Sequence, residues 1–156
     1  MLISLCMIVK DEAAWMEKCI SSAKGLAGQI IVVDTGSSDN TAEIAKKLGA
    51  EVYHFEWNDD TAAARNESLK HATGDWILVL DADETISPGD FGKIRKLTAD
   101  ADYDGYALVQ RNYTSDTYRE DFLWAVNDSY DESMGFTGWV PRLIVRLFRN
   151  KPWIRF

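Results

Sequence analysis

Two aspartates directly follow an apolar segment, and their spacing suits a bound cation. Trp76–Leu80 is an uninterrupted apolar run, and Asp81 and Asp83 come immediately after it. On an extended backbone, side chains at positions i and i+2 point to the same side, so both carboxylates can converge on one point. They repel each other unless a cation or a proton lies between them, and hard divalent ions such as Mg²⁺ or Mn²⁺ prefer oxygen ligands. The spacing therefore predicts a metal site with Asp83 and Asp81 as ligands.

Two other apolar segments also end in polar residues. Residues 2–9 run into Lys10, Asp11 and Glu12, and residues 29–33 run into Asp34 and a short Thr-Gly-Ser-Ser segment. In a parallel α/β sheet, ligands bind beyond the carboxyl ends of the strands. Asp34 can accept hydrogen bonds from a nucleoside, and the segment after it can offer backbone donors at a helix start. The alternative for Asp34 is a helix cap.

Arg65 adds a positive charge to this set of candidate residues. It lies in a predicted helix over residues 61–72, and its neighbours Ala62–Ala64 are small enough for a planar ligand to lie against them. The alternative interpretation of Arg65 is a surface ion pair.

Strand and helix signals alternate through the first hundred residues, which indicates a parallel sheet covered by helices. The expected strands are residues 2–9, 29–33, 51–55 and 76–80, and the expected helices are 11–24, 40–48, 61–72 and 90–98. Ser38 or Asp39 is expected to cap the second helix. Later strands are expected at 103–113, 143–149 and around Trp153–Phe156. Residues 114–139 show no clear periodicity, which indicates a substrate loop, a lid or a poorly ordered segment.

The composition excludes several classes of protein. The chain has 156 residues, enough for one domain with a real core, and 46% of them are hydrophobic. A net charge of −8 argues against nucleic-acid binding. No apolar run approaches the roughly 20 residues of a membrane span, so we expect a cytoplasmic protein, free or at the inner face of the membrane. Cys6 and Cys19 lack disulfide or zinc spacing and are predicted to be buried thiols.

The last part of the chain has the opposite charge. Residues 140–156 contain no acidic residue and five basic ones, which are Arg142, Arg146, Arg149, Lys151 and Arg155. This segment is either a solvated strand edge or a surface that meets a phosphate or an acidic acceptor.

Four segments together resemble the family 2 glycosyltransferases in order and spacing. They are Ser4–Glu12, Ile31–Thr41, Ala64–Asn66 and Leu80–Glu84. The resemblance implies a GT-A fold, with a mostly parallel sheet, helices on both faces and extra mixed strands in the C-terminal third. It also implies a nucleotide-sugar donor, for which we expect a UDP-sugar, with Mg²⁺ or Mn²⁺ as cofactor and inversion at the anomeric carbon. The acceptor is open: a polysaccharide, a lipid, a peptide or a small molecule.

Carried over residue by residue, the resemblance assigns roles at the donor. It makes Asp34 the partner of the base or ribose and gives Arg65 a contact to the uracil or diphosphate. Asp81 then lies near the ribose and diphosphate, and Asp83 is the direct metal ligand. The residues expected to bind substrate or nucleotide are Val9, Glu12, Asp34, Arg65 and Asp81.

Other positions are less fully matched. Asp11 stands where the family more often has asparagine. In the family the general base comes from the second half of the domain, and the available acids Asp128, Asp131 and Glu132 fit no recognisable pattern. The catalytic base is therefore unassigned, and we expect it beyond Phe156 in a longer chain. On this basis residues 1–100 form the nucleotide-sugar-binding half of a single domain, and residues 101–156 form part of the acceptor half.

Aromatic residues are frequent in the second half of the chain. They can stack on a sugar or pack in the core, and they include Trp124, Trp139, Trp153, Tyr113, Tyr118 and Tyr130. His54 and His71 have no partner at metal-ligand spacing and are predicted to be structural.

Two alternatives remain at this point. Leu78–Thr85 also fits the nucleophile motif of haloacid-dehalogenase-type phosphatases, although that motif normally lies on the first strand and is followed by a lysine and an acidic pair. The second alternative is a domain that binds a nucleotide sugar without turnover, and its sign is donor binding without transfer.

Overall fold

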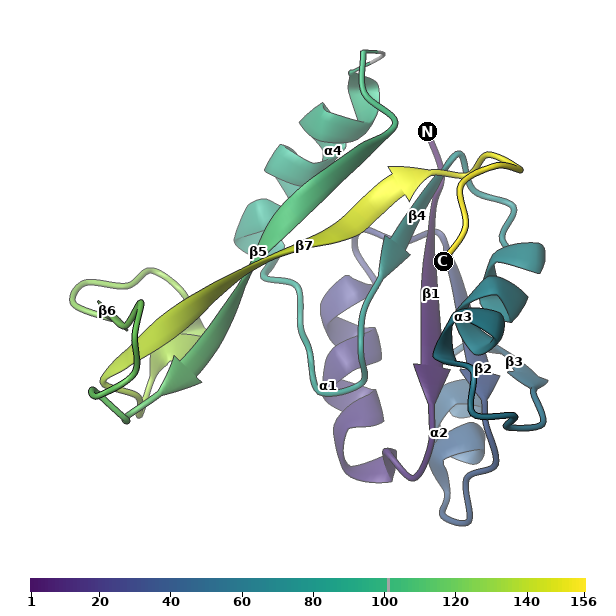
Figure 1. Ribbon diagram of the computed structural model, residues 1–156, viewed down its shortest axis with the longest axis horizontal. Helices are drawn as coiled ribbons and strands as arrows, with labels where there is room; N and C mark the ends of the chain where they lie inside the picture. Colours follow the sequence, from purple (N-terminus) through teal and green to yellow (C-terminus); the bar gives the residue numbers. More distant parts are fainter. Residues whose placement is uncertain (101) are drawn as a thin grey trace. The chain divides into compact units, whose positions relative to one another are not determined.

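The computed structural model describes residues 1–100 and 102–156 (Figure 1). The strands are β1 (Ile3–Val9), β2 (Gln29–Asp34), β3 (Glu51–His54), β4 (Trp76–Val79), β5 (Gly105–Thr114), β6 (Leu123–Trp124) and β7 (Gly138–Arg149). The α-helices are α1 (Ala13–Ala23), α2 (Thr41–Lys47), α3 (Thr61–Lys70) and α4 (Phe91–Ala99), with short 3₁₀ turns η1 (Pro88–Asp90) and η2 (Asp131–Ser133). Within the described ranges, no helix is long and apolar enough to cross a membrane.

The strands form one mixed sheet in the order β3-β2-β1-β4-β7-β5, with β6 paired to β7. The first four strands run parallel, and β7 runs antiparallel beside β4. The register places Val9 of β1 opposite Asp34 of β2, so these two strands end side by side. The predicted sheet, mostly parallel with extra mixed strands late in the chain, is confirmed.

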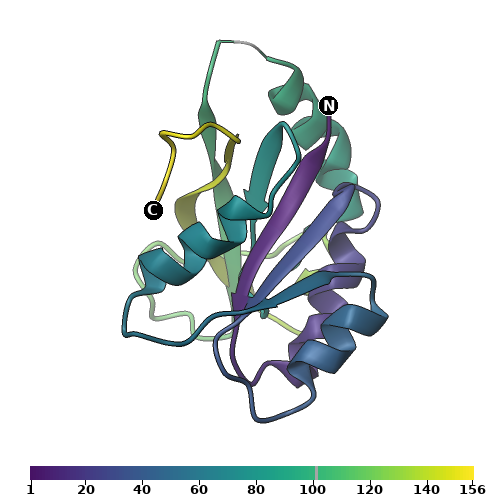
Figure 2. The same cartoon turned by 90° about the vertical axis from the view of Figure 1, so that its right-hand side faces the viewer.

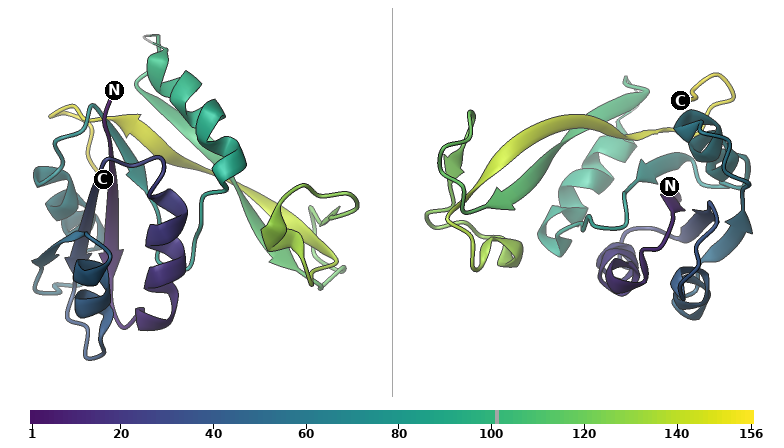
Figure 3. Two further views of the ribbon diagram at one scale, coloured as in Figure 1. Left: turned by 180° about the vertical axis from the view of Figure 1, so that it is seen from behind. Right: turned by 60° about the horizontal axis from the view of Figure 1, so that its bottom comes forward.

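Helices cover both faces of the parallel part of the sheet. The views in Figure 2 and Figure 3 place α1 and α2 on one face and α3 on the other. The buried side chains of α1 recur at helical spacing, which is why this helix packs with one stripe inward, and they are Met16, Cys19, Ile20 and Ala23. The core between the layers includes fully buried Leu5, Ile31, Trp76 and Leu78. Cys6 and Cys19 are free and buried, as predicted.

The chain divides into two compact units. The first contains Met1–Tyr106 and Arg146–Phe156, and the second contains Ala107–Val145. The first unit holds all four α-helices, strands β1 to β4 and the last residues of β7. The functional division into a donor half and an acceptor half near residue 100 stays a prediction.

Most element ends lie within two residues of the expected ones, among them the start of α1, and the larger differences concern the start of β7 and the last expected strand. Helix α1 begins at Ala13 because Asp11 has a φ of 55°, which is not helical. Strand β7 begins at Gly138, within the segment expected to be irregular, because Gly138 and Trp139 pair with β6. The strand expected around Trp153–Phe156 is wrong. There, Ile154 N closes a turn on Lys151 O, and the backbone of Phe156 bonds the side-chain amide of Asn66 instead of a strand.

Candidate functional site

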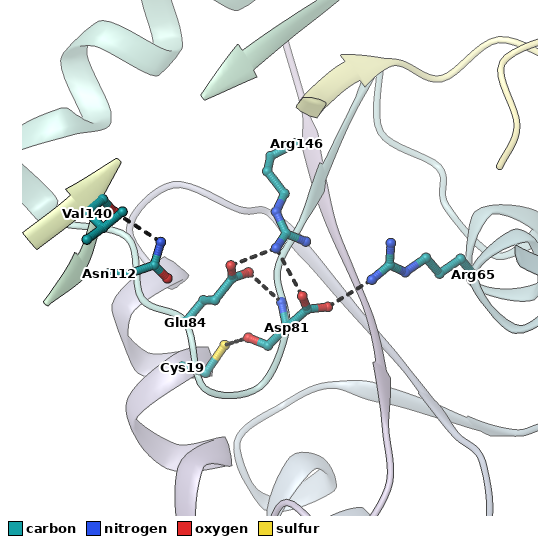
Figure 4. Close-up of polar contacts among 7 residues, drawn as sticks. All are labelled: Cys19, Arg65, Asp81, Glu84, Asn112, Val140 and Arg146. Carbon is teal, nitrogen blue, oxygen red and sulfur yellow. Dashed lines mark hydrogen bonds and ion pairs between the residues drawn. The ribbon is translucent and has the colours of Figure 1, made fainter. Parts of the chain in front are cut away.

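Asp81, which follows β4 closely, is held between two arginines from different elements (Figure 4). Its Oδ1 accepts a hydrogen bond from Arg65 Nη2 of α3 at 3.1 Å, and its Oδ2 accepts one from Arg146 Nη2 of β7 at 3.0 Å. The side chain of Asp81 is still 41% exposed. These residues are distant in the sequence, and they meet because β7 lies next to β4 in the sheet.

Glu84 and Arg146 form the buried part of this site. Arg146 Nη2 lies 2.6 Å from Glu84 Oε1, and the two side chains are only 9% and 10% exposed. Burial raises the pKa of the Glu84 carboxyl, and the hydrogen bond from Asp81 N and the charge of Arg146 oppose that rise. A buried carboxylate is tolerated in such a place because it has a charged partner and a hydrogen-bond donor.

Residues 81–84 form a turn, not an extension of the strand. Glu84 N donates to Asp81 O at 3.0 Å, and Asp81 N donates back to Glu84 Oε2 at 2.8 Å. The expected extended geometry, with both aspartates on one side of a strand, is therefore wrong. The side chain of Glu84 closes the turn because it accepts the backbone N–H of Asp81, which lies just after the end of β4.

Asp83 is the free carboxylate of this turn. It is exposed, and it forms no hydrogen bond or ion pair with any residue that the structure describes. Because Asp81 is occupied at both oxygens and Asp83 is not, Asp83 is the better placed of the two to bind an incoming cation.

Arg65 projects from α3 toward the same turn. Its Nε–H is buried and has no hydrogen-bond partner in the described part of the chain. Its guanidinium carbon lies 5.3 Å from the centre of the Phe156 ring, in cation–π range. The ion-pair interpretation of Arg65 is confirmed by the contact with Asp81.

Asp34 ends β2 and closes the loop that follows it. Its Oδ1 accepts hydrogen bonds from Ser37 N at 3.0 Å and Ser37 Oγ at 2.6 Å. Gly36 has a φ of 104°, a conformation that glycine adopts without strain. The carbonyl of Val9 accepts from both the N–H and the hydroxyl of Thr35, at 2.9 and 3.1 Å. Asp34 is thus a loop-closing residue and not the helix cap considered from the sequence, since α2 begins only at Thr41.

Asp11 ties the end of β1 to the same loop. Its Oδ1 accepts from Ser38 N at 2.7 Å and Ser38 Oγ at 3.0 Å, and its own N–H donates to Ser37 Oγ at 3.0 Å. The hydrogen bonds from the backbone and the side chain of Ser38 lower the pKa of the Asp11 carboxyl. Asp11 therefore joins the two strand ends that carry the other candidate residues.

Asp39 supports the starts of two helices. Its carboxylate accepts from Ala13 N at 3.1 Å and Thr41 N at 2.9 Å and also bonds the Thr41 hydroxyl. The N-cap position of α2 is occupied by Asn40, whose side chain makes no capping bond. The predicted cap at Ser38 or Asp39 is therefore wrong in position, although Asp39 supplies the bond that a cap would make.

Glu12 carries the clearest sign of concentrated negative charge. Burial raises the pKa of its carboxyl, and the charges of Asp83, Asp39, Asp11 and Asp81 add to the rise, in that order. Its N–H donates to Thr41 Oγ1 at 2.8 Å. The ends of β1, β2 and β4 thus place acidic groups near one another, as the sequence predicted.

The residues present fit a hard divalent cation that shares its ligands with a substrate. In the described residues, no group of three or more His, Cys, Asp or Glu side chains is gathered closely enough to hold a metal alone. A small cation such as Mg²⁺ is typically bound by one or two carboxylates together with substrate phosphates and water. One exposed, unpaired carboxylate at Asp83 with Asp81 beside it matches that requirement.

The second unit contains a separate ion pair with aromatic neighbours. Asp128, whose side chain is 5% exposed, accepts from Arg111 Nη1 at 2.7 Å. The guanidinium carbon of Arg111 lies 4.2 Å from the Tyr130 ring centre and 4.3 Å from the Trp139 ring centre. The Tyr113 hydroxyl also contacts Asp128, at 3.4 Å. This arrangement gives Asp128, Tyr130 and Trp139 a structural role within their own unit.

The remaining aromatic candidates and histidines fall into two groups. Tyr118, Trp124 and Trp153 are exposed, with Trp124 edge-on to Phe122 and Trp153 beside the Lys151 ammonium group. His71 stacks on Tyr53 with ring centres 3.5 Å apart and contacts Glu67, which agrees with the structural role predicted for it.

Arg146 is the site residue whose role the sequence did not reveal. In the sequence it is one of five basic residues near the end of the chain, yet it is only 7% exposed. A usable signal was present, because Arg146 stands directly before Leu147 and Phe148 in a strand that pairs with β4. A charge beside core residues at the buried end of a strand needs a partner of opposite sign.

Comparison with known sequences identifies related proteins. The family profile described as Glycosyl transferase family 2 matches residues 4–149. A TPR repeat-containing protein of Synechococcus elongatus is 37% identical over 155 residues, which are 99% of this chain and 33% of that protein. The chain thus spans about a third of the length of this relative.

Two solved structures share the fold. S. aureus TarS superposes with a TM-score of 0.60 over 96% of this chain and 47% of that chain, at 19% identity. The mannosyltransferase PcManGT of Pyrobaculum calidifontis, in complex with GDP-Man and Mn²⁺, gives a TM-score of 0.59 over 66% of this chain and 34% of that chain, at 21% identity. These likenesses show the GT-A fold.

Proposed function

The chain belongs to glycosyltransferase family 2, and from that premise we propose that it binds the nucleotide-sugar donor of a sugar transfer at the carboxyl ends of β1, β2 and β4. The observation that carries the proposal is the turn after β4. Asp81 is fixed there by two arginines, and Asp83 has no partner in the described ranges. The phosphatase alternative finds no support, since its motif lies on β4 and the family match spans residues 4–149.

The donor is proposed to be a UDP-sugar held by residues of the first unit. Asp34 accepts hydrogen bonds from the base or ribose through Oδ2, because Oδ1 is used by Ser37. The guanidinium of Arg65, whose side chain is 27% exposed beside Asp81, contacts the uracil or the diphosphate. The backbone of Val9 and the carboxyl of Glu12 complete the edge of the site beside Asp81.

Asp83 is proposed to hold Mg²⁺ or Mn²⁺, with Asp81 next to it. When bound, the cation offsets the negative charge that grows on the departing diphosphate, and this stabilises the transition state more than the ground state. Asp81, kept in place by the arginines, orients the ribose and diphosphate. We propose inversion at the anomeric carbon, which requires a base on the opposite face of the sugar. Asp128 is a poor candidate for that base because Arg111 neutralises it in a buried position.

The test is nucleotide binding by the Asp83→Ala variant. Calorimetry with UDP and, separately, GDP in the presence of Mn²⁺ should show binding to the unchanged protein. We expect Asp83→Ala to weaken Mn²⁺-dependent binding by roughly tenfold or more, because the free metal ligand is lost. The melting temperature should change by less than about 2 °C, since Asp83 supports no contact in the fold.

Glu17→Ala is the matched control, because Glu17 is an exposed acid on α1 with no hydrogen bond or ion pair in the described part of the chain. Equal affinity in the Asp83→Ala and Glu17→Ala proteins would remove Asp83 from the metal site. Tighter binding of GDP than of UDP would show that the nucleobase is guanine and not uracil, and the proposed location of the site would stand.

A second candidate function is donor binding without turnover by this chain. It is favoured by the pairing of Asp128 with Arg111, which leaves the second unit without a free buried acid at that position. Release of free sugar or transfer to any acceptor by the 156-residue protein would exclude it.

A further inference from the structure

Arg146 makes two contacts through a single nitrogen. Its Nη2 lies 3.0 Å from Asp81 Oδ2 and 2.6 Å from Glu84 Oε1, so one donor atom joins the two ends of the turn after β4 (Figure 4). The residue is 7% exposed, and its neighbours Leu147 and Phe148 belong to the core. The position of this nitrogen is therefore set by the packing of β7 against β4 and not by solvent.

Glu84 is bound at both of its oxygens. Oε1 contacts Arg146, and Oε2 accepts the N–H of Asp81. The backbone carbonyl of Asp81 in turn accepts the N–H of Glu84. Arg146 is thus linked through Glu84 to the backbone of Asp81. We therefore expect a shift of Arg146 to move both Glu84 and the backbone of Asp81.

The carboxylate of Asp81 binds two arginines, one at each oxygen. Arg65 holds Oδ1 from α3, and Arg146 holds Oδ2 from β7. Rotation of the carboxylate would break at least one of these hydrogen bonds. With Arg146 removed, Arg65 alone would direct Asp81, and Asp81 could turn toward α3 and away from Asp83.

We propose that Arg146 is a positioning residue for the binding of a nucleoside diphosphate with its divalent cation. It fixes the orientation of Asp81 and the shape of the 81–84 turn, and so keeps Asp83 as the open ligand. The proposal rests on the proposed function. The competing explanation is that Arg146 only neutralises the buried charge of Glu84.

The Glu84→Gln and Glu84→Gln/Arg146→Met variants separate these explanations. Glutamine keeps an acceptor for Asp81 N but removes the buried charge, so Arg146 is no longer needed for neutralisation. If Arg146 positions Asp81, the double variant should bind UDP with Mn²⁺ roughly tenfold more weakly than Glu84→Gln. Equal affinity of the two proteins, both folded, would overturn the proposal. Arg142→Met is the control, because Arg142 lies exposed on the same strand.

A second readout does not depend on nucleotide binding. Crystal structures of the metal-free and nucleotide-free variants should show Asp81 unmoved in Glu84→Gln and rotated toward Arg65 in the double variant. The same Asp81 orientation in both structures would overturn the proposal. If the unchanged protein binds neither UDP nor GDP with Mn²⁺, the proposed function fails, and this structural comparison still decides the role of Arg146.

Arg146→Lys covers the case in which the double variant does not fold. An ammonium nitrogen can donate to two carboxylates, as Nη2 does. Binding within about fivefold of the unchanged protein would support a bridging nitrogen, and a larger loss would overturn it.

Discussion

The backbone of Asp11 suits either aspartate or asparagine at this position. Its φ of 55° lies in the left-handed region, where these two residue types are enriched over other non-glycine residues. The oxygen that accepts from Ser38 N and Oγ has a counterpart in the asparagine side chain. Either residue can therefore close the loop, and aspartate adds one negative charge near Glu12.

The two cysteines lead to a prediction about thiol reactivity. Burial raises the pKa of Cys6 and of Cys19 to about 12 in each case. The thiolate is the reactive form, so at about pH 8 both thiols should react with a chromogenic disulfide reagent at least roughly a hundredfold more slowly than free cysteine. Absorbance against time gives the rate.

Unfolding in concentrated guanidinium chloride is the control, because it should release both thiols at once. A fast native phase that Cys19→Ser abolishes would contradict the burial of Cys19 beneath the 81–84 turn, where its Sγ lies 3.5 Å from Asp81 O.

At the scale of elements, α3 depends on the residue that precedes it. Asp60 is the N-cap, and its carboxylate accepts from Ala63 N at 2.9 Å. Loss of an N-cap side chain typically costs about 1 kcal/mol, so Asp60→Ala should lower the free energy of unfolding by about that amount, whereas Asp60→Asn should keep most of it. Urea denaturation gives both values.

Glu56→Ala serves as the reference for this measurement, since Glu56 is exposed and has no hydrogen bond or ion pair in the described residues. A loss no greater in Asp60→Ala than in Glu56→Ala would show that the cap does not stabilise α3.

Helices and strands with a regular apolar pattern could be predicted from the sequence. Features that depend on contacts between residues distant in the sequence could not. The apolar runs at Ile3–Val9 and Trp76–Val79 were found because central parallel strands are apolar on both faces. The start of β7 at Gly138 depends on pairing with β6, which leaves no local signal. In the site, the turn at residues 81–84 and the burial of Arg146 follow from contacts between β4 and β7, which spacing along the chain does not encode.

At the scale of the whole molecule, the two compact units differ in how much they bury. In residues 107–145, all of which are described, Gly138 is the only residue buried as a whole, although the side chain of Asp128 is also buried, whereas β4 is buried throughout. The second unit is held together by contacts among half-buried side chains, such as those of Arg111 with the rings of Tyr130 and Trp139. Local opening requires less free energy where few apolar groups are buried.

Hydrogen exchange should therefore separate the units. We expect amides of β1, β2 and β4 to exchange at least roughly tenfold more slowly than those within residues 107–145. Mass spectrometry of peptides from each unit measures the difference. Equal protection in both units would contradict the reliance of the second unit on exposed contacts.

The late position of Arg146 has a consequence for synthesis on the ribosome. When synthesis has reached residue 100, Glu84 and Asp81 are present, but Arg146, which bridges them, lies 46 residues further along the chain. A nascent chain can assemble β1, β2 and β3 at that stage, but the acidic turn beside them keeps an unmatched charge until translation reaches β7. The turn at residues 81–84 is therefore completed late when the chain folds during synthesis.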